Sequence, residues 1–365
     1  MKFLTFILFF AAATVSFATT IKDGDRMKDL SFKTSTGTTL KYLLFVPKNY
    51  NASQKYPLVV TLHAAGSDYI YQVNNNDQAH PWIEDSVQAK WPCFIMAPGC
   101  PSGSWGGMFG AGTSLSPECT AVIEAIEDLK KQYSLDTNRF IIGGFSIGGA
   151  GTYHMIKFLP DYWAAACPVA AGGDSLQFDV ASKIPTPIWH HHGTNDQNGA
   201  ALIRMSAALV KNHYPVLRIT CDMVVNTPAG WLAEIQKGTK PQNIIFKNSV
   251  PSYDSVSKAV DAGAKYIFQL ITGATHEDSR LNANHNPLLA KWAFSKVRGG
   301  ATNVRMVPVY AKPAETLLKP YGTVLTFGNS GRFTADRTCT ALGQASPDRE
   351  IGKTYGVRIL MVRKP

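Results

Sequence analysis

The sequence alternates short apolar runs with longer amphipathic stretches, and this alternation restricts the fold more than any other feature. The stretch 116–133 repeats apolar residues three and four positions apart, which is the period of a helix with one buried face. The apolar runs are short and continuous, as in strands that are buried on both sides. Such strands, separated by helices, predict an α/β fold with a mostly parallel sheet and helices on both faces. The predicted strands lie at 41–47, 56–64, 93–98, 139–144, 164–173, 186–193 and 264–271.

The N-terminal segment 1–18 is typical of a secretory signal peptide, because Lys2 precedes an apolar run and the small residues Ser16 and Ala18 suit cleavage after Ala18. No other stretch of the sequence is apolar for long enough to cross a bilayer. We therefore expect a secreted, periplasmic or cell-surface protein. In an oxidising compartment the six cysteines can form disulfides, and Cys100 with Cys119 is the first pair to test.

Two segments depart from the alternation, so we expect residues 19–298 to form the main domain with two additions. Residues 198–248 are long for a simple connection and predict a lid-like insertion. A β-rich C-terminal extension, 299–365, carries ten Lys and Arg against four Asp and Glu. This basic tail suits contact with an acidic polymer or a cell surface, and a merely solvated face explains it equally well. The sequence lacks the interleaved basic and aromatic residues that are typical of a nucleic-acid site, so we expect no nucleic-acid partner.

A glycine-rich turn, GGFSIGGAG at 143–151, follows one predicted strand and precedes a helical pattern. It contains the pattern G-x-S-x-G with Ser146 at its centre. In this strand–turn–helix setting the serine hydroxyl projects above the sheet, and the turn accepts only small neighbours. The sequence therefore predicts Ser146 as a nucleophile.

A serine nucleophile needs a base, and the base needs a third group that orients it. In this arrangement an acid and then a histidine follow the serine along the chain, each at the end of a strand. Asp196 and His276 meet both conditions. Asp174 is a weaker alternative for the acid because its loop should lie nearer the serine than the histidine. His285 is a weaker alternative for the base because it lies beyond the strand end.

Attack by serine places negative charge on the carbonyl oxygen, which two aligned amides can stabilise. The amide of Ile147, directly after the serine, is the first candidate for this oxyanion hole. The predicted strand 56–64 leads into the sequence HAAG, and the amide of Ala65 is the second candidate.

Three consecutive histidines, His190-His191-His192, invite interpretation as a metal site. Alternate residues of a strand face opposite sides, so the three side chains cannot all bind one ion. We interpret them as packing residues of a strand and its turn, and we expect neither a metal nor another cofactor.

With these motifs the chain, from about residue 40 to 298, resembles secreted α/β-hydrolase esterases akin to carbohydrate esterase family 1. That group includes feruloyl and acetylxylan esterases, together with polyhydroxybutyrate-depolymerase-like and "predicted peptidase" relatives. The resemblance implies the α/β-hydrolase fold and the same triad of Ser146, Asp196 and His276. It also implies that the loop with Ser104 and Trp105 borders the acyl or sugar pocket, where the indole either stacks on a ligand or only packs. The likeness rests on PLVVTLHAAG, FIMAPGCPSGSW, YSLDTNRFIIGGFSIGGAGTYH, AAACPVAAGGD, PIWHHHGTND and ATHE.

The chain departs from this group at three places. Ala64 follows His63 where the group usually has glycine, which puts the geometry of the oxyanion loop in question. The segment 198–248 and the tail 299–365 have no counterpart in the group. The end of the tail, YGVRILMVRKP, resembles C-terminal sorting domains of outer-membrane secretion systems.

The resemblance implies a secreted serine esterase that cleaves feruloyl or acetyl esters of plant cell-wall polysaccharide through an acyl-enzyme. A polyester depolymerase of the polyhydroxybutyrate type and a serine peptidase are the alternatives among enzymes. The alternative from another class is an inactive hydrolase-fold protein that binds polysaccharide, and the complete triad argues against it.

Overall fold

A computed structural model describes residues 27–74, 78–106, 114–171, 185–196, 199–299, 323–326 and 358–361. The predicted signal peptide, the alternative acid Asp174, Cys339 and most of the basic tail lie outside these ranges. In the described part of the chain, no helix combines the length and the apolar character that crossing a membrane requires.

Nine of the described strands form one sheet. At one edge β1 and β2 are antiparallel, and β2 is antiparallel to β4, whereas all other neighbours are parallel. This mostly parallel sheet confirms the fold class that the alternation predicts. In sheet order the strands are β1 (Met27–Lys33), β2 (Thr39–Phe45), β4 (Phe94–Pro98), β3 (Tyr56–Leu62), β5 (Leu135–Phe145), β6 (Ala165–Val169), β7 (Ile188–Gly193), β9 (Tyr266–Thr272) and β8 (Val216–Asp222).

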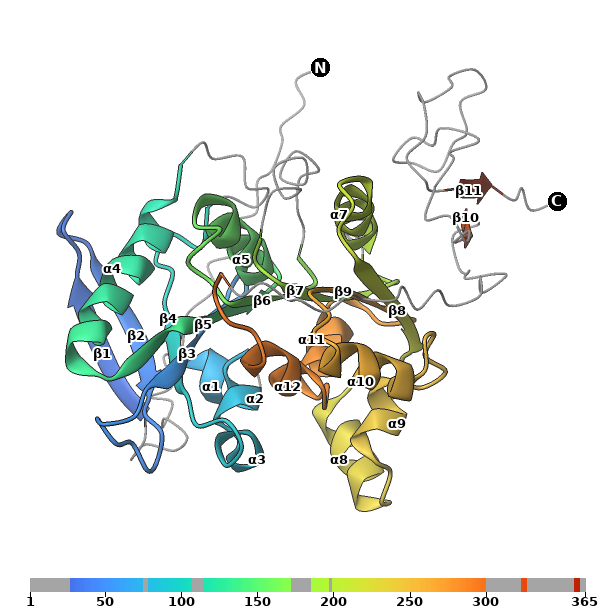
Figure 1. Ribbon diagram of the computed structural model, residues 1–365, viewed down its shortest axis with the longest axis horizontal. Coiled ribbons are helices and arrows are strands. Elements are labelled where there is room, and N and C mark those ends of the chain that lie inside the picture. Colours follow the sequence, from blue (N-terminus) through green and yellow to red (C-terminus); the bar gives the residue numbers. More distant parts are fainter. Residues whose placement is uncertain are drawn as a thin grey trace, which may run out of the picture.

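Helices cover both faces of the sheet (Figure 1). One face carries α4 (Pro117–Gln132), α5 (Ile147–Phe158) and α7 (Gly199–Lys211). On the opposite face lie α1 (Tyr71–Asn74), α2 (His80–Ile83), α3 (Asp85–Gln88), α8 (Pro228–Gln236), α9 (Pro241–Ile245), α10 (Tyr253–Asp261) and α12 (Leu289–Phe294). A further helix, α11 (His276–Asn284), begins shortly after the carboxyl end of β9.

The sheet separates two large hydrophobic clusters, one on each face. On β3, Leu58, Val60 and Leu62 belong to the cluster beneath α4, α5 and α7, whereas Val59 belongs to the cluster on the opposite face. Successive side chains of a strand point to opposite faces, so both sides of β3 must be apolar. This explains why the central strands are continuous apolar runs.

The segment 198–248 differs from the expected lid-like insertion. Its first half forms α7 and then β8, which pairs with β9 in parallel and becomes an edge strand of the main sheet. Burial alternates along β8, as an edge strand with one covered face requires. Its second half forms α8 and α9, and α9 buries Ile244 and Ile245. The segment therefore widens the fold itself, because an apolar face of β8 completes the core beside β9.

The cysteines also differ from the expectation. The described cysteines, Cys93, Cys100, Cys119, Cys167 and Cys221, are all buried free thiols. The thiol of Cys119 donates to the carbonyl of Trp105 at 3.2 Å, and the thiol of Cys100 lies 3.7 Å from the hydroxyl of Ser102. The proposed bridge between Cys100 and Cys119 is therefore wrong for this structure, because each thiol points to an oxygen rather than to the other sulfur.

Two short strands are described beyond residue 299. β10 (Thr323–Thr326) and β11 (Arg358–Met361) pair in antiparallel fashion. The anchoring, sorting or binding role of the tail stays a prediction.

Candidate active site

The serine-bearing turn connects β5 to α5. Ser146 has φ 58° and ψ −118°, a conformation that residues other than glycine rarely adopt. Its amide donates to the carbonyl of Val169 on the neighbouring strand β6 at 3.0 Å, and its carbonyl accepts from the amide of Ala150 at 3.0 Å. The strained turn is therefore held from the sheet on one side and by the helix on the other.

The glycines beside the serine are required by close approach of the backbone. A Cβ on Gly144 would lie 2.4 Å from the carbonyl carbon of Gly148. A Cβ on Gly148 would lie 2.0 Å from the carbonyl oxygen of Leu62 on β3. Both separations are far below van der Waals contact, so β3, β5 and α5 can meet here only because these residues lack side chains.

Asp196 and His276 meet at the carboxyl ends of β7 and β9. Nδ1 of His276 lies 2.7 Å from Oδ2 of Asp196. A carboxylate can only accept, so the imidazole donates from Nδ1 and its Nε2 is available as a base. The Asp196 side chain is 1% exposed and the His276 side chain is 36% exposed. The acid is therefore enclosed, and the imidazole that it orients is open to solvent.

The loops that carry this acid and this histidine are tied together through their backbones. Asn195 donates its amide to the carbonyl of Ala274 at 2.9 Å, and the amide of Gly273 donates to the hydroxyl of Thr194 at 2.8 Å. A Cβ on Gly193 would lie 2.1 Å from the carbonyl oxygen of Ala274. The glycine of the HGTND segment thus permits the close approach of the two loops.

Phe145 connects these loops with the serine turn. Its ring lies against that of His276, with centroids 4.7 Å apart. It also belongs to a small buried cluster against which Ala64, from the loop after β3, packs. Because Phe145 directly precedes Ser146, its side chain links the serine turn to His276 and to the loop after β3.

The two amides expected to form an oxyanion hole, those of Ile147 and Ala65, donate to no acceptor within the described part of the chain. Ile147 begins α5, and a helix leaves its first amides unpaired at its positive end. The loop before Ala65 is fixed by His63, whose Nε2 accepts from the Cys100 amide at 3.0 Å. Burial lowers the pKa of His63, which keeps the ring in its neutral, accepting form at neutral pH.

Ala64 replaces a glycine of the resembling group without strain. Gly66 has φ 70°, so the left-handed residue of this loop is two positions further on. Ala64 is not among the residues with positive φ. The backbone of the loop therefore does not need glycine at position 64.

Trp105 and Ser104 take different positions. Trp105 is 1% exposed, and its indole N–H donates to the carbonyl of His63 at 3.0 Å. Helix α5 packs so closely on Trp105 that a Cβ added at Gly151 would collide with the Trp105 Cβ. A ring so enclosed cannot stack on a ligand, so Trp105 packs and supports the loop after β3 through the His63 carbonyl. Ser104 is partly exposed and lines a surface cavity together with His154.

The three consecutive histidines point alternately to the two faces, as the strand period predicts. His191 stacks on Trp189, and its Nε2 accepts from the side-chain amide nitrogen of Asn286 at 2.9 Å. His190 and His192 lie on the other face with their ring nitrogens 3.1 Å apart, and Nε2 of His192 lies 3.0 Å from the Asp196 carboxylate. This last contact was missed by the interpretation as packing residues, although the spacing of four between His192 and Asp196 at a strand end is visible in the sequence.

The remaining alternatives have other surroundings. His285, the weaker candidate for the base, stacks on Trp231 with centroids 4.0 Å apart. Burial lowers the pKa of His285 to about 4. Among the described residues, no three His, Cys, Asp or Glu side chains are grouped so that they could hold a metal ion.

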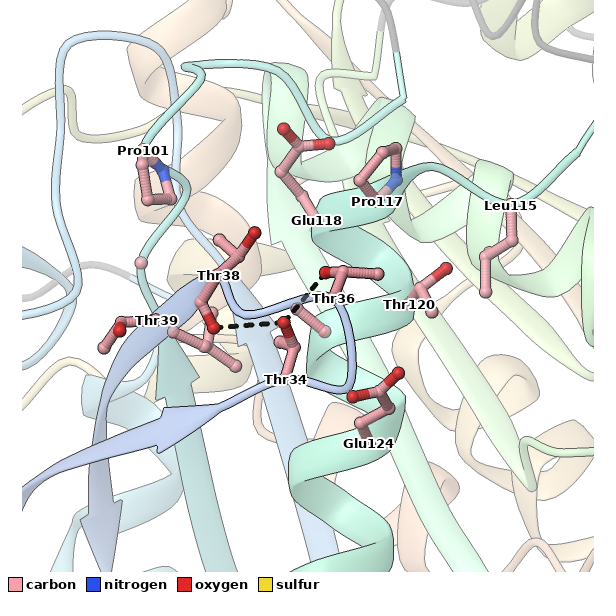
Figure 2. A pocket seen from close by; sticks show the side chains of 13 residues that line it. Thr34, Thr36, Thr38, Thr39, Pro101, Leu115, Pro117, Glu118, Thr120 and Glu124 are labelled. Atoms are coloured by element: carbon pink, nitrogen blue, oxygen red, sulfur yellow. Dashed lines mark hydrogen bonds between the residues drawn. The ribbon is translucent and has the colours of Figure 1, made fainter.

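A cavity of about 340 Å³ opens at the carboxyl end of β4, beside the N-terminus of α4 (Figure 2). Strands β4, β3 and β5 are neighbours, so this end of β4 lies about 10 Å from the serine-bearing end of β5. Glu124 is held by the amide and hydroxyl of Ser35, whereas Glu118 has no hydrogen bond or ion pair within the described residues. The polar lining consists of Thr34, Thr36, Thr38, Thr39, Thr120, Glu118 and Glu124.

Comparison with known proteins agrees with this architecture. A model of the prolyl oligopeptidase family matches residues 117–277. A solved structure titled "Crystal Structure of a Thermostable Esterase" superposes with a TM-score of 0.53 at 28% identity, over 75% of this chain and 64% of that one. The chain has the α/β-hydrolase fold.

Among curated proteins, this α/β hydrolase is similar to esterases. It is 29% identical over 165 residues to the "Bifunctional acetylxylan esterase/xylanase XynS20E" of Neocallimastix patriciarum. This match covers 45% of this chain and 22% of that protein. It is 29% identical over 115 residues to "Probable feruloyl esterase C" of Aspergillus oryzae, covering 32% of this chain and 40% of that protein. The matches therefore span well under half the length of these relatives.

Proposed function

We propose that this α/β hydrolase is a secreted serine esterase. The observation that carries the proposal is the buried Asp196 bonded to an outward-facing His276, beside a strained turn that presents Ser146. A hydroxyl, a buried acid and a base in this order along the chain form the machinery of acyl transfer.

In the proposed reaction, His276 takes the proton from Ser146 as Oγ attacks the ester carbonyl carbon. The amides of Ile147 and Ala65 stabilise the negative oxygen of the tetrahedral intermediate. The ester bond then breaks, and the alcohol leaves with the proton from His276, so that an acyl-serine forms. Water, deprotonated by His276, attacks the acyl-serine, the bond to Oγ breaks, and His276 returns the proton to Oγ as the acid is released.

We further propose feruloyl or acetyl esters of plant cell-wall polysaccharide as the substrate class. The named activities of the two similar curated proteins support this choice. The cavity beside α4 also supports it, because its threonine hydroxyls and the carboxylate of Glu118 are suitable partners for sugar hydroxyls.

The first test replaces the nucleophile. We expect Ser146→Ala to lower kcat on p-nitrophenyl acetate and on methyl ferulate by more than about a thousandfold, because loss of a triad member removes most of the rate enhancement. Ser206→Ala is the matched control, since Ser206 is buried in α7 and its hydroxyl bonds to the Ile203 carbonyl and the Arg218 side chain rather than to Asp196 or His276, so the variant should keep near wild-type activity. A Ser146→Ala protein with more than about a hundredth of wild-type activity would show that another group attacks the ester.

The second test distinguishes the substrates. We expect hydrolysis of acetylated xylan and feruloylated oligosaccharides to exceed hydrolysis of polyhydroxybutyrate and of peptides. If Glu118 binds sugar, Glu118→Ala should raise KM for a feruloylated oligosaccharide by about tenfold through loss of a charge-assisted hydrogen bond, and leave KM for p-nitrophenyl acetate unchanged. Faster cleavage of the polyester or the peptide would instead select one of the other enzyme classes. Binding to xylan without hydrolysis of any ester would identify a binding protein.

A further inference from the structure

A buried row of polar side chains leads from helix α5 across the sheet to the acid of the site. The Tyr153 hydroxyl lies 2.7 Å from Nδ1 of His190, and Nε2 of His190 lies 3.1 Å from Nδ1 of His192. Nε2 of His192 lies 3.0 Å from Oδ2 of Asp196, the oxygen that also accepts from His276. Tyr153, His190 and His192 are each at most 3% exposed.

The chemistry of the last member fixes the direction of these contacts. The Asp196 carboxylate has no proton to give, so Nε2 of His192 must carry the hydrogen that faces it. With the only ring hydrogen of His192 on Nε2, its Nδ1 is an acceptor and receives the Nε2–H of His190. Nδ1 of His190 in turn accepts from the hydroxyl of Tyr153. Burial holds the pKa of His190 well below its ordinary value, which agrees with a neutral ring that donates from one nitrogen and accepts at the other.

We infer that His192, held by His190 and Tyr153, is a positioning residue for the acid of the site: this row orients Asp196 and compensates the charge of Oδ2, the oxygen that also accepts from His276. The inference rests on the proposed function, since it assigns Asp196 the role of orienting the base. The Nε2–H of His192 is not aligned for a regular hydrogen bond in this state, although it lies within ion-pair distance.

The row has a measurable consequence for the protonation of His276. Without the His192 ring beside it, Oδ2 of Asp196 presents its full negative charge to His276 and favours the imidazolium form of His276. The acid limb of kcat/KM, which reports protonation of the free enzyme's base, then moves to higher pH. Among the described residues, the charged groups beside His276 on α11 are engaged elsewhere: Asp278 forms the helix cap with Thr275, and Arg280 pairs with Glu277 and lies over the Phe145 ring. They stay constant when the row is changed.

The experiment compares His192→Leu with His191→Leu in the full-length protein. His191 is the matched control because it lies on the same strand with the same complete burial but faces the other side of the sheet. We expect His192→Leu to lower kcat on p-nitrophenyl acetate by about tenfold with KM within about twofold, and to raise the acid limb by about half a pH unit. His191→Leu should leave the limb in place. His192→Gln, whose amide can donate toward Asp196, should restore kcat to within about threefold of the wild type.

Three results would overturn the inference: an unmoved acid limb in His192→Leu, an equal shift in His191→Leu, or a Gln variant as slow as the Leu variant. Tyr153→Phe, which removes only a hydroxyl, carries the test if His192→Leu does not fold. It should move the limb in the same direction by about 0.2 pH unit, and an unchanged limb counts against the row. An active Ser146→Ala would remove the proposed function itself. If Ser146→Ala is inactive and the acid limb of kcat/KM is unchanged in the His192 variants, only this inference is contradicted and the proposed function stands.

Discussion

The close approach of the acid-bearing and histidine-bearing loops can be tested by adding one methyl group. In Gly193→Ala, the new Cβ would lie 2.1 Å from the carbonyl oxygen of Ala274 and 2.9 Å from the hydroxyl of Ser279, whereas real Cβ atoms keep at least about 3.0 Å. The Ala274 carbonyl belongs to backbone and must therefore retreat by about 1 Å. Ala274 lies two residues before His276, so the imidazole moves with it.

A displacement of about 1 Å at a reacting group can cost about a hundredfold in rate, and overpacking of this kind costs about 1–3 kcal/mol in the free energy of unfolding. We therefore expect Gly193→Ala to lower kcat/KM on p-nitrophenyl acetate by about a hundredfold while the protein still folds. The assays are steady-state hydrolysis and urea unfolding followed by tryptophan fluorescence.

The control is Gly230→Ala in α8. There the nearest atom to the added Cβ is the hydroxyl of Thr227 at 3.1 Å, a contact that a side chain can relieve. Its kcat/KM should stay within about twofold of the wild type. A folded Gly193→Ala protein that keeps more than a third of the wild-type kcat/KM would refute the argument, since the two loops would then tolerate separation.

Two further predictions follow from buried side chains. Trp105→Phe removes the indole donor to the carbonyl of His63, so it should lower kcat about tenfold by loosening the proposed oxyanion loop. Trp163 is the control, because its indole nitrogen has no partner among the described residues. Trp163→Phe should leave kcat unchanged. Burial lowers the pKa of His191 to about 3 from its ordinary 6.5. Between these pH values the unfolded chain binds a proton at His191 and the folded chain does not. The free energy of unfolding therefore keeps the full His191 contribution above pH 6.5 and falls as the pH drops below it. Urea unfolding at pH 8 and pH 5 should show that the His191 contribution to this loss is about 2 kcal/mol, and His191→Leu should reduce the pH dependence by that amount; an equal slope in wild type and variant would contradict the assignment.

The central strands and the order of the site along the chain could be predicted because they depend on local pattern. Ser146 follows an apolar run that forms the end of β5, and the glycines beside it predict a turn with no room for side chains. Asp196 and His276 close two further runs, and parallel strands bring such ends to one edge of the sheet. Their hydrogen bond follows from that topology, which is why the acid and histidine predicted from sequence are found together.

The rest depends on contacts between distant segments. β8 is half polar, as an edge strand must be, so its sequence does not resemble the buried runs and led to the expectation of a lid. The sequence is equally compatible with Trp105 as a residue that stacks on a ligand and as a packing residue. Its hydrogen bond to the carbonyl of His63, which the sequence does not show, decides for packing. His192 reads as one of three packing residues until its neighbour across the turn is identified as Asp196. In each case the deciding partner lies in another part of the chain.

The position of β8 has a consequence for assembly of the sheet during synthesis. β8 precedes β9 along the chain, yet β9 lies between β7 and β8. A ribosome releases residues 216–222 before the strand with which they pair exists, so β7 and β8 must both wait with open edges until residues 266–272 emerge and insert between them. The short antiparallel bridge from Thr220 to Val250 already covers the outer side of β8 at that stage. The last gap in this sheet is thus filled by the strand that leads into the loop before His276, so closing the sheet also brings the histidine to Asp196.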